Sequence, residues 1–162
     1  MDIKKGNQDF LNILENNKEL KDRRDELVKG QHPDTLIITC SDSRVVPEYI
    51  FNASLGELFV IRTAGNVINE GELATVEYAI EHLKVKRIIV LGHTHCGAIH
   101  AAINNEHGMY LDPILNRIKT NISIIHIRKH PMFRYRTSLI QLCPYSQGTY
   151  FLDIQLHQWS SF

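Results

Sequence analysis

Short apolar runs rich in β-branched residues alternate with longer amphipathic segments through most of this chain. The runs at 35–40, 58–62 and 87–91 predict buried strands, because a strand that is covered on both faces is apolar along its whole length. Between the last two runs, apolar residues recur at helical spacing over 70–83, which predicts a helix. A strand, a helix and a strand at this separation are typical of a parallel crossover. The pattern therefore favours an α/β fold with a central, mainly parallel β-sheet flanked by helices.

The segment before the first strand carries a different pattern. Apolar side chains at spacings of three, four and seven over 7–29 predict an amphipathic helix with a break near Asn16 and Asn17. Gly30 and Pro33 end this helix, because glycine suits the position after a helix and proline cannot continue one. We therefore expect a helical arm ahead of the sheet.

Shorter elements are expected over the rest of the chain. Brief helical periodicity or a proline entry predicts short helices at 45–52, 96–104 and 111–118. Apolar, β-branched runs predict further strands at 123–127, 138–142 and 149–154.

Length and charge narrow the function. The 162 residues suit one domain with its own core, which we divide into an arm over 1–30, an α/β core over 31–121 and a C-terminal region over 122–162. Lysine plus arginine and aspartate plus glutamate both number 18, so no net field attracts nucleic acid or a membrane surface. The apolar runs are too short to cross a bilayer, and the start of the chain lacks the apolar core of a signal peptide. We expect a cytoplasmic protein with a small-molecule substrate.

Two cysteine-containing motifs directly follow two of the predicted strands. Cys-Ser-Asp-Ser-Arg occupies 40–44 after the first strand, and Gly-His-Thr-His-Cys-Gly occupies 92–97 after the third. We expect the motifs to meet, because the carboxyl ends of parallel strands share one edge of the sheet, where ligands bind. Thiolate and imidazole are preferred zinc ligands, and a fourth position would remain for water or a carboxylate. The candidate ligands are Cys40, His93 and Cys96.

Charged neighbours complete the expected site. If the chain stays extended after the first strand, the side chains of Cys40, Asp42 and Arg44 project to the same side. Arginine binds a carboxylate through two parallel bonds, so Arg44 would hold Asp42 ionised and fixed in orientation. Cys96 is expected at a helix N-terminus, where the free amides lower the pKa of a thiol.

Each of these residues also has a structural interpretation. A single cysteine after an apolar run is more often a core residue than a ligand, and His93 alone would suit a helix cap or a core. The coincidence of both motifs at strand ends favours a metal site. Cys143 has no such companions, and we interpret it as structural. His95 alternates with His93 and is expected to point away from the site.

The motifs resemble those of the β-class carbonic anhydrases. Cys-x-Asp-x-Arg at 40–44 and His-x-x-Cys-Gly at 93–97 match the family's two signatures. Similar words stand at 30–33, 56–62, 64–66 and 77–80. The resemblance runs from about residue 9 to residue 103.

The resemblance implies an enzyme, a zinc-dependent lyase that reversibly hydrates carbon dioxide to bicarbonate and a proton through a zinc-bound hydroxide. One zinc ion per chain would be held by Cys40, His93 and Cys96. Asp42 and Arg44 would be the catalytic pair beside it, with Asp42 as a fourth ligand in a closed form of the site.

Further roles follow from the resemblance alone. Gln31, Phe59 and Tyr78 match positions that line the substrate cleft of the family, several of them across a subunit interface. His82, one helical turn from Tyr78, either helps to move protons or is simply an exposed polar residue. Closed members tend to carry tryptophan where this chain has Ile37, which favours the open form.

The resemblance also bears on assembly. It implies a homodimer or a dimer of dimers in which the helical arm packs on a partner subunit. Residues 122–162 are shorter or more divergent than the family's usual helical stretch and last strand. This difference would alter the packing of the dimer and, through it, the activity. Three alternatives remain: hydrolysis of carbon disulfide or carbonyl sulfide at the same site, a catalytically impaired zinc-binding structural domain, and a Cys-His thiol hydrolase.

Overall fold

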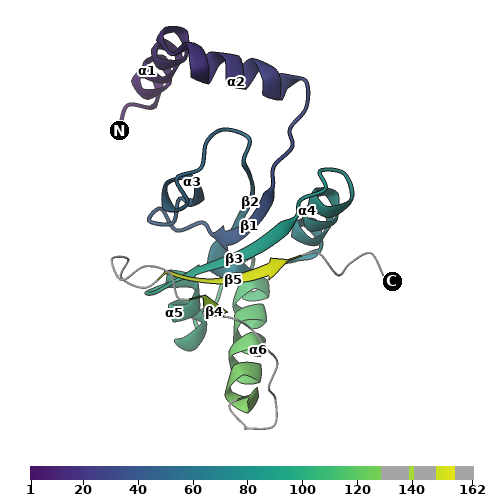
Figure 1. Ribbon diagram of the computed structural model, residues 1–162. Coiled ribbons are helices and arrows are strands. Elements are labelled where there is room, and N and C mark those ends of the chain that lie inside the picture. The colour runs from purple at the N-terminus through teal and green to yellow at the C-terminus, as the bar shows by residue number, and fades with distance from the viewer. Residues whose placement is uncertain (129–138, 141–148, 156–162) are drawn as a thin grey trace.

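A five-stranded sheet forms the centre of the structure, a computed structural model that describes residues 1–128, 139–140 and 149–155 (Figure 1). The strands lie in the order β2-β1-β3-β5-β4. Their bounds are Thr35–Cys40 (β1), Leu58–Thr63 (β2), Arg87–His93 (β3), Leu139–Ile140 (β4) and Thr149–Gln155 (β5).

Three parallel strands make up the part of the sheet that positions the site. β1 pairs in parallel with β2 on one side and with β3 on the other, while β5 runs antiparallel to β3 and to β4. The predicted α/β fold with a mainly parallel centre is thus confirmed. In register, Cys40 lies opposite Thr63, and Thr39 lies opposite Leu91. The carboxyl ends of the three strands therefore meet at one edge, as expected.

The central strand β1 is buried at all of its positions, which explains its apolar sequence. Leu36 and Ile38 pack on one face of the sheet with Ala79 of the helix over 70–81. Ile37 points to the other face and packs with Val45 and Ile89. Because side chains alternate along a strand, one apolar run supplies both cores.

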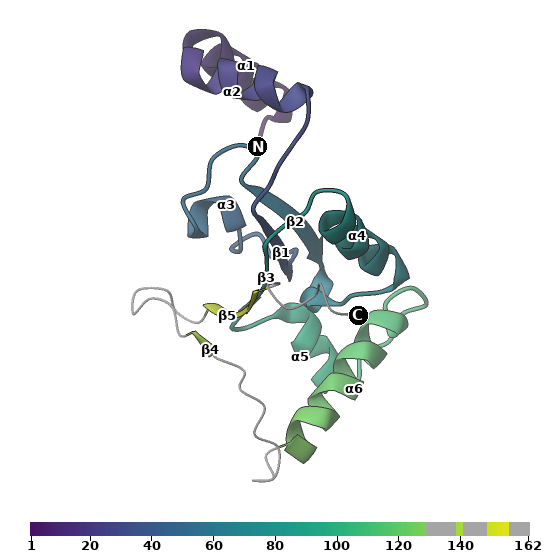
Figure 2. The ribbon, with the colours of Figure 1, turned by 45° about the vertical axis from the view of Figure 1, so that its right-hand side comes forward.

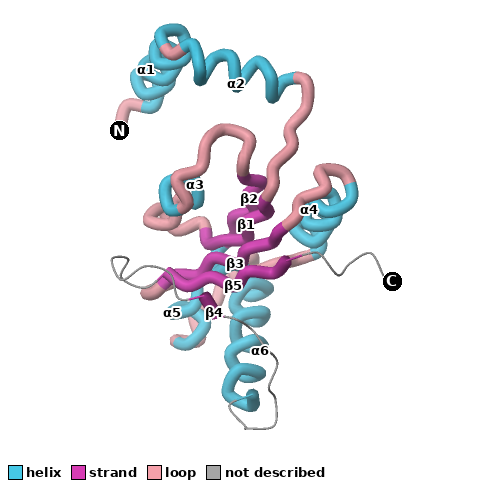
Figure 3. Tube along the Cα trace, viewed as in Figure 1, coloured by secondary structure: helices cyan, strands magenta, loops and turns pink. Residues whose placement is uncertain are grey.

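Except for the first two, the helices lie around the sheet, as Figure 3 shows. Their bounds are Ile3–Asn16 (α1), Lys18–Val28 (α2), Pro47–Ile50 (α3), Glu70–Glu81 (α4), Gly97–Ile103 (α5) and Asp112–Arg128 (α6), with a 3₁₀ turn η1 at Ala64–Asn66. None of the helices in the described part of the chain is long and apolar enough to span a membrane.

Two expectations about the elements have clear outcomes. The break between α1 and α2 is confirmed, and Asn17 causes it by capping α2, where its side chain accepts from the amide of Leu20 at 3.0 Å. The strand expected at 123–127 is wrong, because α6 continues through it. A β-branched run favours a strand only weakly, whereas a helix that has already begun extends at little cost.

The C-terminal strands agree with the expectations where they are described. The predicted strand at 149–154 is confirmed as β5, and β4 falls inside the run at 138–142. The remainder of that run and Cys143 lie outside the described residues.

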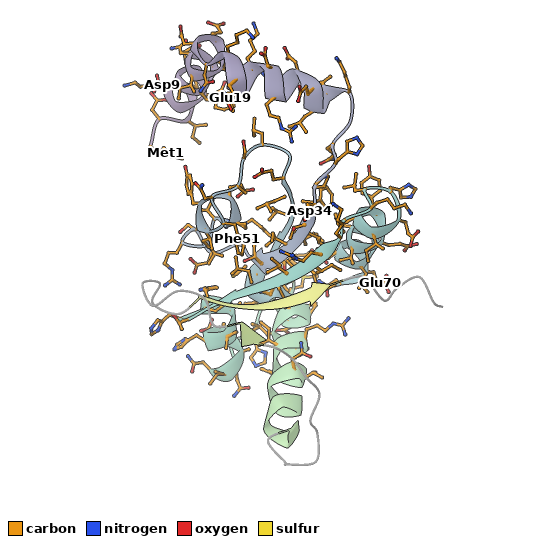
Figure 4. The ribbon with its side chains drawn as sticks, viewed as in Figure 1. Met1, Asp9, Glu19, Asp34, Phe51 and Glu70 are labelled. Atoms are coloured by element: carbon orange, nitrogen blue, oxygen red, sulfur yellow. The ribbon has the colours of Figure 1, made fainter. Side chains whose placement is uncertain are left out.

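The arm formed by α1 and α2 projects away from the sheet (Figures 1 and 2). Figure 4 places Asp9 and Glu19 on it, well apart from the labelled residues of the sheet region. The arm touches the body near residues 55–56, where Arg23 Nε donates to Leu55 O at 3.1 Å. Leu27 covers Gly56, whose φ of 81° suits glycine and where a Cβ would collide with the leucine.

Candidate metal centre

Three potential ligands converge at the carboxyl edge of the parallel strands. Cys40 ends β1, His93 ends β3, and Cys96 is the N-cap residue of α5. Their ligand atoms all lie within 4.8 Å of one another. Both cysteines are free, and their sulfur atoms are 3.9 Å apart. The expected meeting of the two motifs is therefore present in the structure.

The two nitrogens of the His93 ring have different surroundings. Nδ1 lies 2.9 Å from the carbonyl oxygen of Thr94. Because a carbonyl only accepts, Nδ1 carries the proton and Nε2 presents its lone pair. Among the described residues, Nε2 is a buried side-chain nitrogen without a hydrogen-bond partner. A buried lone pair is costly to leave unsatisfied, so this atom suits a metal ion.

The two thiols are buried, and burial affects the ionisation of Cys96. Cys40 is 5% exposed and Cys96 is 6% exposed. Burial raises the pKa of Cys96 above its ordinary value and outweighs the lowering by the amides of Ile99 and Ala98. The predicted lowering at the helix N-terminus is therefore wrong for the metal-free chain, because loss of water disfavours the thiolate more than the amides favour it. A divalent cation between the sulfurs would supply the missing charge.

The donor set fits zinc. Two sulfurs and one imidazole nitrogen match the ligand types of zinc sites, and three protein ligands leave one position open, as in catalytic sites. Hard oxygen-seeking ions such as magnesium would be poorly served by this set. The fit rests on the chemistry of the three side chains and on the bare Nε2 of His93.

Asp42 and Arg44 form a two-bond ion pair beside the ligands. Arg44 Nε donates to Asp42 Oδ1 at 2.9 Å, and Arg44 Nη2 donates to Oδ2 at 2.8 Å. The backbone amide of Arg44 also donates to Oδ1 at 2.9 Å, which forms a local Asx turn. These side-chain and backbone hydrogen bonds from Arg44 hold the pKa of the Asp42 carboxyl far below its usual range. The carboxylate is thus ionised and fixed in orientation.

The route to this pair differs from the expected one. The chain does not stay extended after Cys40 but turns, and the amide of Val45 donates to Asp42 O at 2.9 Å. The turn, rather than strand alternation, brings Asp42 and Arg44 together. Asp42 Oδ2 lies 3.9 Å from His93 Nδ1, so the pair borders the ligand group.

Arg44 also connects the two motif loops. Its Nη2 donates to the carbonyl oxygen of His95 at 3.2 Å. His95 adopts a left-handed φ of 55°, which turns the chain between His93 and Cys96. The His95 side chain is exposed, consistent with its expected direction away from the ligands.

Two residues that the sequence did not single out contact the first motif. Arg62 of β2 donates to the carbonyl oxygens of Cys40 and Asp42, and the amide of Gly65 lies 3.4 Å from Cys40 Sγ as a donor. Both contacts depend on the register of β2 beside β1, which residue patterns alone do not specify.

Gly65 is closely packed at this position. It has a φ of 66°, and a Cβ built on it would lie 2.9 Å from Ile118 Cδ1 and 3.1 Å from Ala98 Cβ. We expect Gly65→Ala to destabilise the fold by about 1–3 kcal/mol through overpacking and backbone strain, measured by urea unfolding. Gly71→Ala is the matched control, because nothing lies within 4 Å of a Cβ there. Equal stability of the two variants would contradict the close packing of Gly65.

The proposed substrate residues do not join the ligand group within one chain. Phe59 lies opposite Leu36, four residues before Cys40, which is about 13 Å along the strand. Tyr78 packs near Phe59 with ring centroids 6.2 Å apart, and His82 stacks on Tyr78 at 5.2 Å. Gln31 is exposed in the segment between α2 and β1. Their role in binding substrate stays a prediction.

Comparisons with known proteins agree on one family. A family model described as carbonic anhydrase matches residues 35–138. "Carbonic anhydrase 2" of Mycobacterium tuberculosis is 38% identical over 126 residues, which cover 74% of this chain and 61% of that protein. The chain spans 61% of the length of that protein and 31% of the length of the carbonic anhydrase of Synechococcus elongatus, to which it is 51% identical over 85 residues.

Solved structures show the same relationship. The β-carbonic anhydrase CcaA is 34% identical and superposes with a TM-score of 0.64 over 78% of this chain and 66% of that one. A tetrameric β-carbonic anhydrase of Sordaria macrospora is 30% identical, with a TM-score of 0.59 over 80% of this chain and 71% of that one.

Proposed function

The chain belongs to the β-class carbonic anhydrase family, and we propose that it reversibly hydrates carbon dioxide to bicarbonate and a proton with one zinc ion per chain. The convergence of Cys40, His93 and Cys96, with the lone pair of His93 Nε2 unpartnered, carries this proposal. We assign these three residues as the zinc ligands.

Each side chain of the site has a defined task. The two thiolates and the imidazole would hold the ion, which supplies Lewis acidity that makes a water molecule reactive near neutral pH. Asp42, kept ionised by Arg44, can only accept hydrogen bonds. Its carboxylate would therefore accept a hydrogen bond from the reacting water and orient the water's lone pair toward carbon dioxide. Arg44 keeps that acceptor in one direction.

The arrangement of Asp42 supports the open form of the site. Both of its carboxylate oxygens accept hydrogen bonds from Arg44. Asp42 does not belong to the group of ligand atoms that lie within 4.8 Å of one another, so its carboxylate would have to move toward that group to become a fourth ligand, and the bonds from Arg44 oppose this movement. The fourth position would then belong to water in the resting protein.

The alternative functions are not favoured. The family model that matches the chain and the relatives reported above are carbonic anhydrases, which favours carbon dioxide over carbon disulfide or carbonyl sulfide as the substrate. An ionised Asp42 beside an open ligand position suits a catalytic site better than a closed structural one. For a thiol hydrolase, burial is unhelpful, because it raises the pKa of Cys96 and so reduces its nucleophilic form.

The experiment that tests this function is stopped-flow hydration of carbon dioxide by the zinc-loaded protein, with carbonyl sulfide and carbon disulfide assayed in parallel. We expect hydration that depends on zinc and is lost after chelation. Zinc-loaded protein that hydrolyses carbonyl sulfide or carbon disulfide but leaves carbon dioxide unchanged would contradict the proposal.

We propose that the protein forms a homodimer or a dimer of dimers through its arm. Phe10, Leu11 and Ile13 of α1 are 45%, 39% and 54% exposed, although α1 is amphipathic. The arm stands clear of the sheet (Figure 2), so a second copy can reach this face. The tetrameric assembly of the Sordaria macrospora relative supports the same interpretation.

Replacing Phe10 with glutamate tests the arm. Burial of such a side chain contributes about 1.5–3 kcal/mol, so we expect the dissociation constant to rise by at least about 10-fold in sedimentation velocity runs. Gln8→Glu on the same helix adds the same charge at an exposed polar position and is the control. An unchanged sedimentation coefficient for Phe10→Glu at all concentrations would exclude the arm from the interface.

Other parts of the picture stay predictions. We propose the arm over 1–30, the zinc-binding core over 31–121 and the shortened or divergent region over 122–162 as the organisation of a single domain. The cytoplasmic location and the absence of nucleic-acid and membrane partners remain expectations from charge and composition.

A further inference from the structure

A second arginine, on the neighbouring strand, donates two hydrogen bonds to the backbone of the first motif loop. Arg62 lies on β2 opposite Thr39 of β1. Its guanidinium reaches past the end of β1, where Nε donates to Cys40 O at 3.3 Å and Nη2 donates to Asp42 O at 2.9 Å. Two donors of one planar group fix both the position and the angle of the loop.

These two hydrogen bonds of Arg62 lie where the pairing of β1 with β2 ends. The amide of Ser41 still donates to Thr63 O at 3.0 Å, which continues the ladder one residue beyond β1. The next carbonyl, that of Asp42, accepts from the amide of Val45 at 2.9 Å and from Arg62. Arg62 therefore fastens the turn at residues 42–45 to the sheet.

The two carbonyl oxygens that accept from Arg62 belong to residues of the site. Cys40 supplies a ligand sulfur, and Asp42 supplies the carboxylate beside it. Asp42 is held at two points, its carboxylate by Arg44 and its backbone by Arg62. Arg44 is part of the loop and ties it to the second motif, whereas Arg62 is part of the sheet and ties the loop to the scaffold.

We propose that Arg62 is a positioning residue, which holds the Cys40 sulfur and the Asp42 carboxylate in the relative geometry that zinc and the reacting water require. The proposal rests on the proposed function for its catalytic consequence. The two hydrogen bonds themselves are present in the metal-free chain. A lysine at this position could not replace it fully, because one ammonium cannot reproduce the planar fork of two donors.

Hydrogen exchange of the metal-free protein directly tests whether the hydrogen bonds from Arg62 stabilise the loop. Arg62→Met keeps the apolar stem of the side chain and removes both donors. We expect the amides of Ser41, Arg44 and Val45 to exchange about 10–100-fold faster, because charge-assisted hydrogen bonds are lost. Amides of α4 should be unchanged. Arg24→Met, an exposed arginine of the arm, is the control for loss of one positive charge.

Metal release tests the consequence for the site. We expect Arg62→Met to lose zinc to a chromogenic chelator about 10–100-fold faster than wild type, as is typical when a partner of a ligand is removed. The cobalt-substituted protein should show shifted thiolate-to-cobalt and ligand-field bands. Arg62→Lys should fall between wild type and Arg62→Met in each measurement.

The outcomes separate the two proposals. Wild-type protein that binds neither zinc nor cobalt would overturn the proposed function. The exchange rates would still show whether Arg62 stabilises the first motif loop. Wild type that binds zinc, with Arg62→Met matching Arg24→Met in exchange and metal release, would overturn the role of Arg62 alone. If Arg62→Met does not fold, Arg62→Lys is compared in its place, and exchange and zinc release equal to wild type would overturn the proposal.

Discussion

Replacing Cys40 with serine is expected to lower zinc affinity by more than about 100-fold. Removing a residue that only hydrogen-bonds to a ligand already lowers the affinity by up to about 100-fold, and the loss of a ligand should cost more. Serine keeps the size of the side chain but not the thiolate, so only two ligand atoms of the group remain. Carbon dioxide hydration should fall to the uncatalysed rate. Zinc content by atomic absorption and hydration by stopped flow measure the two effects on the same sample.

Cys143→Ser is the matched control for this substitution. The sequence interprets Cys143 as structural, so zinc content and hydration should equal those of wild type. Cys40→Ser protein that retains one zinc per chain would contradict the ligand assignment. Loss of zinc in both variants to the same degree would show that neither cysteine has a specific role.

Replacing Asp42 with asparagine is expected to lower kcat by about 10²–10⁴-fold while zinc content stays at one per chain. The amide lacks the charge that pairs with Arg44, and its NH₂ group donates where the carboxylate oxygen accepted. The reacting water would lose its oriented acceptor. Steady-state hydration kinetics and metal analysis separate this loss of turnover from a loss of metal.

Asp34→Asn is the control for the same chemical change away from the site. Asp34 pairs with Lys86 at 3.0 Å, and its side chain is 53% exposed, so its replacement should leave kcat within the error of wild type. Wild-type kcat in Asp42→Asn would show that the carboxylate takes no part in the reaction.

The parallel core and the meeting of the motifs were predictable because both follow from simple periodicity. The run Thr35–Cys40 is buried throughout, is apolar apart from Thr35 and Thr39, and has the boundaries of β1. Once β1 and β3 are parallel neighbours, their carboxyl ends must lie together, and Cys40 and His93 stand at those ends. The convergence of the candidate ligands thus needed no knowledge of individual contacts.

The features that the sequence did not predict depend on tertiary geometry. Arg62 acts through the offset between β2 and the end of β1, which sets the carbonyls within its reach. The raised pKa of Cys96 depends on how completely the thiol is buried, and this burial outweighs its place at a helix N-terminus. The extension of α6 over 123–127 reflects cooperative helix growth rather than the local β-branched residues.

Zinc K-edge absorption spectroscopy on size-separated protein, combined with carbon dioxide hydration by the same fraction, tests the central claim most directly. The proposed site predicts one zinc per chain with two sulfur neighbours at about 2.3 Å and two nitrogen or oxygen neighbours at about 2.0 Å, in a fraction that hydrates carbon dioxide. A zinc shell without two sulfurs, or a fully loaded fraction without hydration activity, would contradict it.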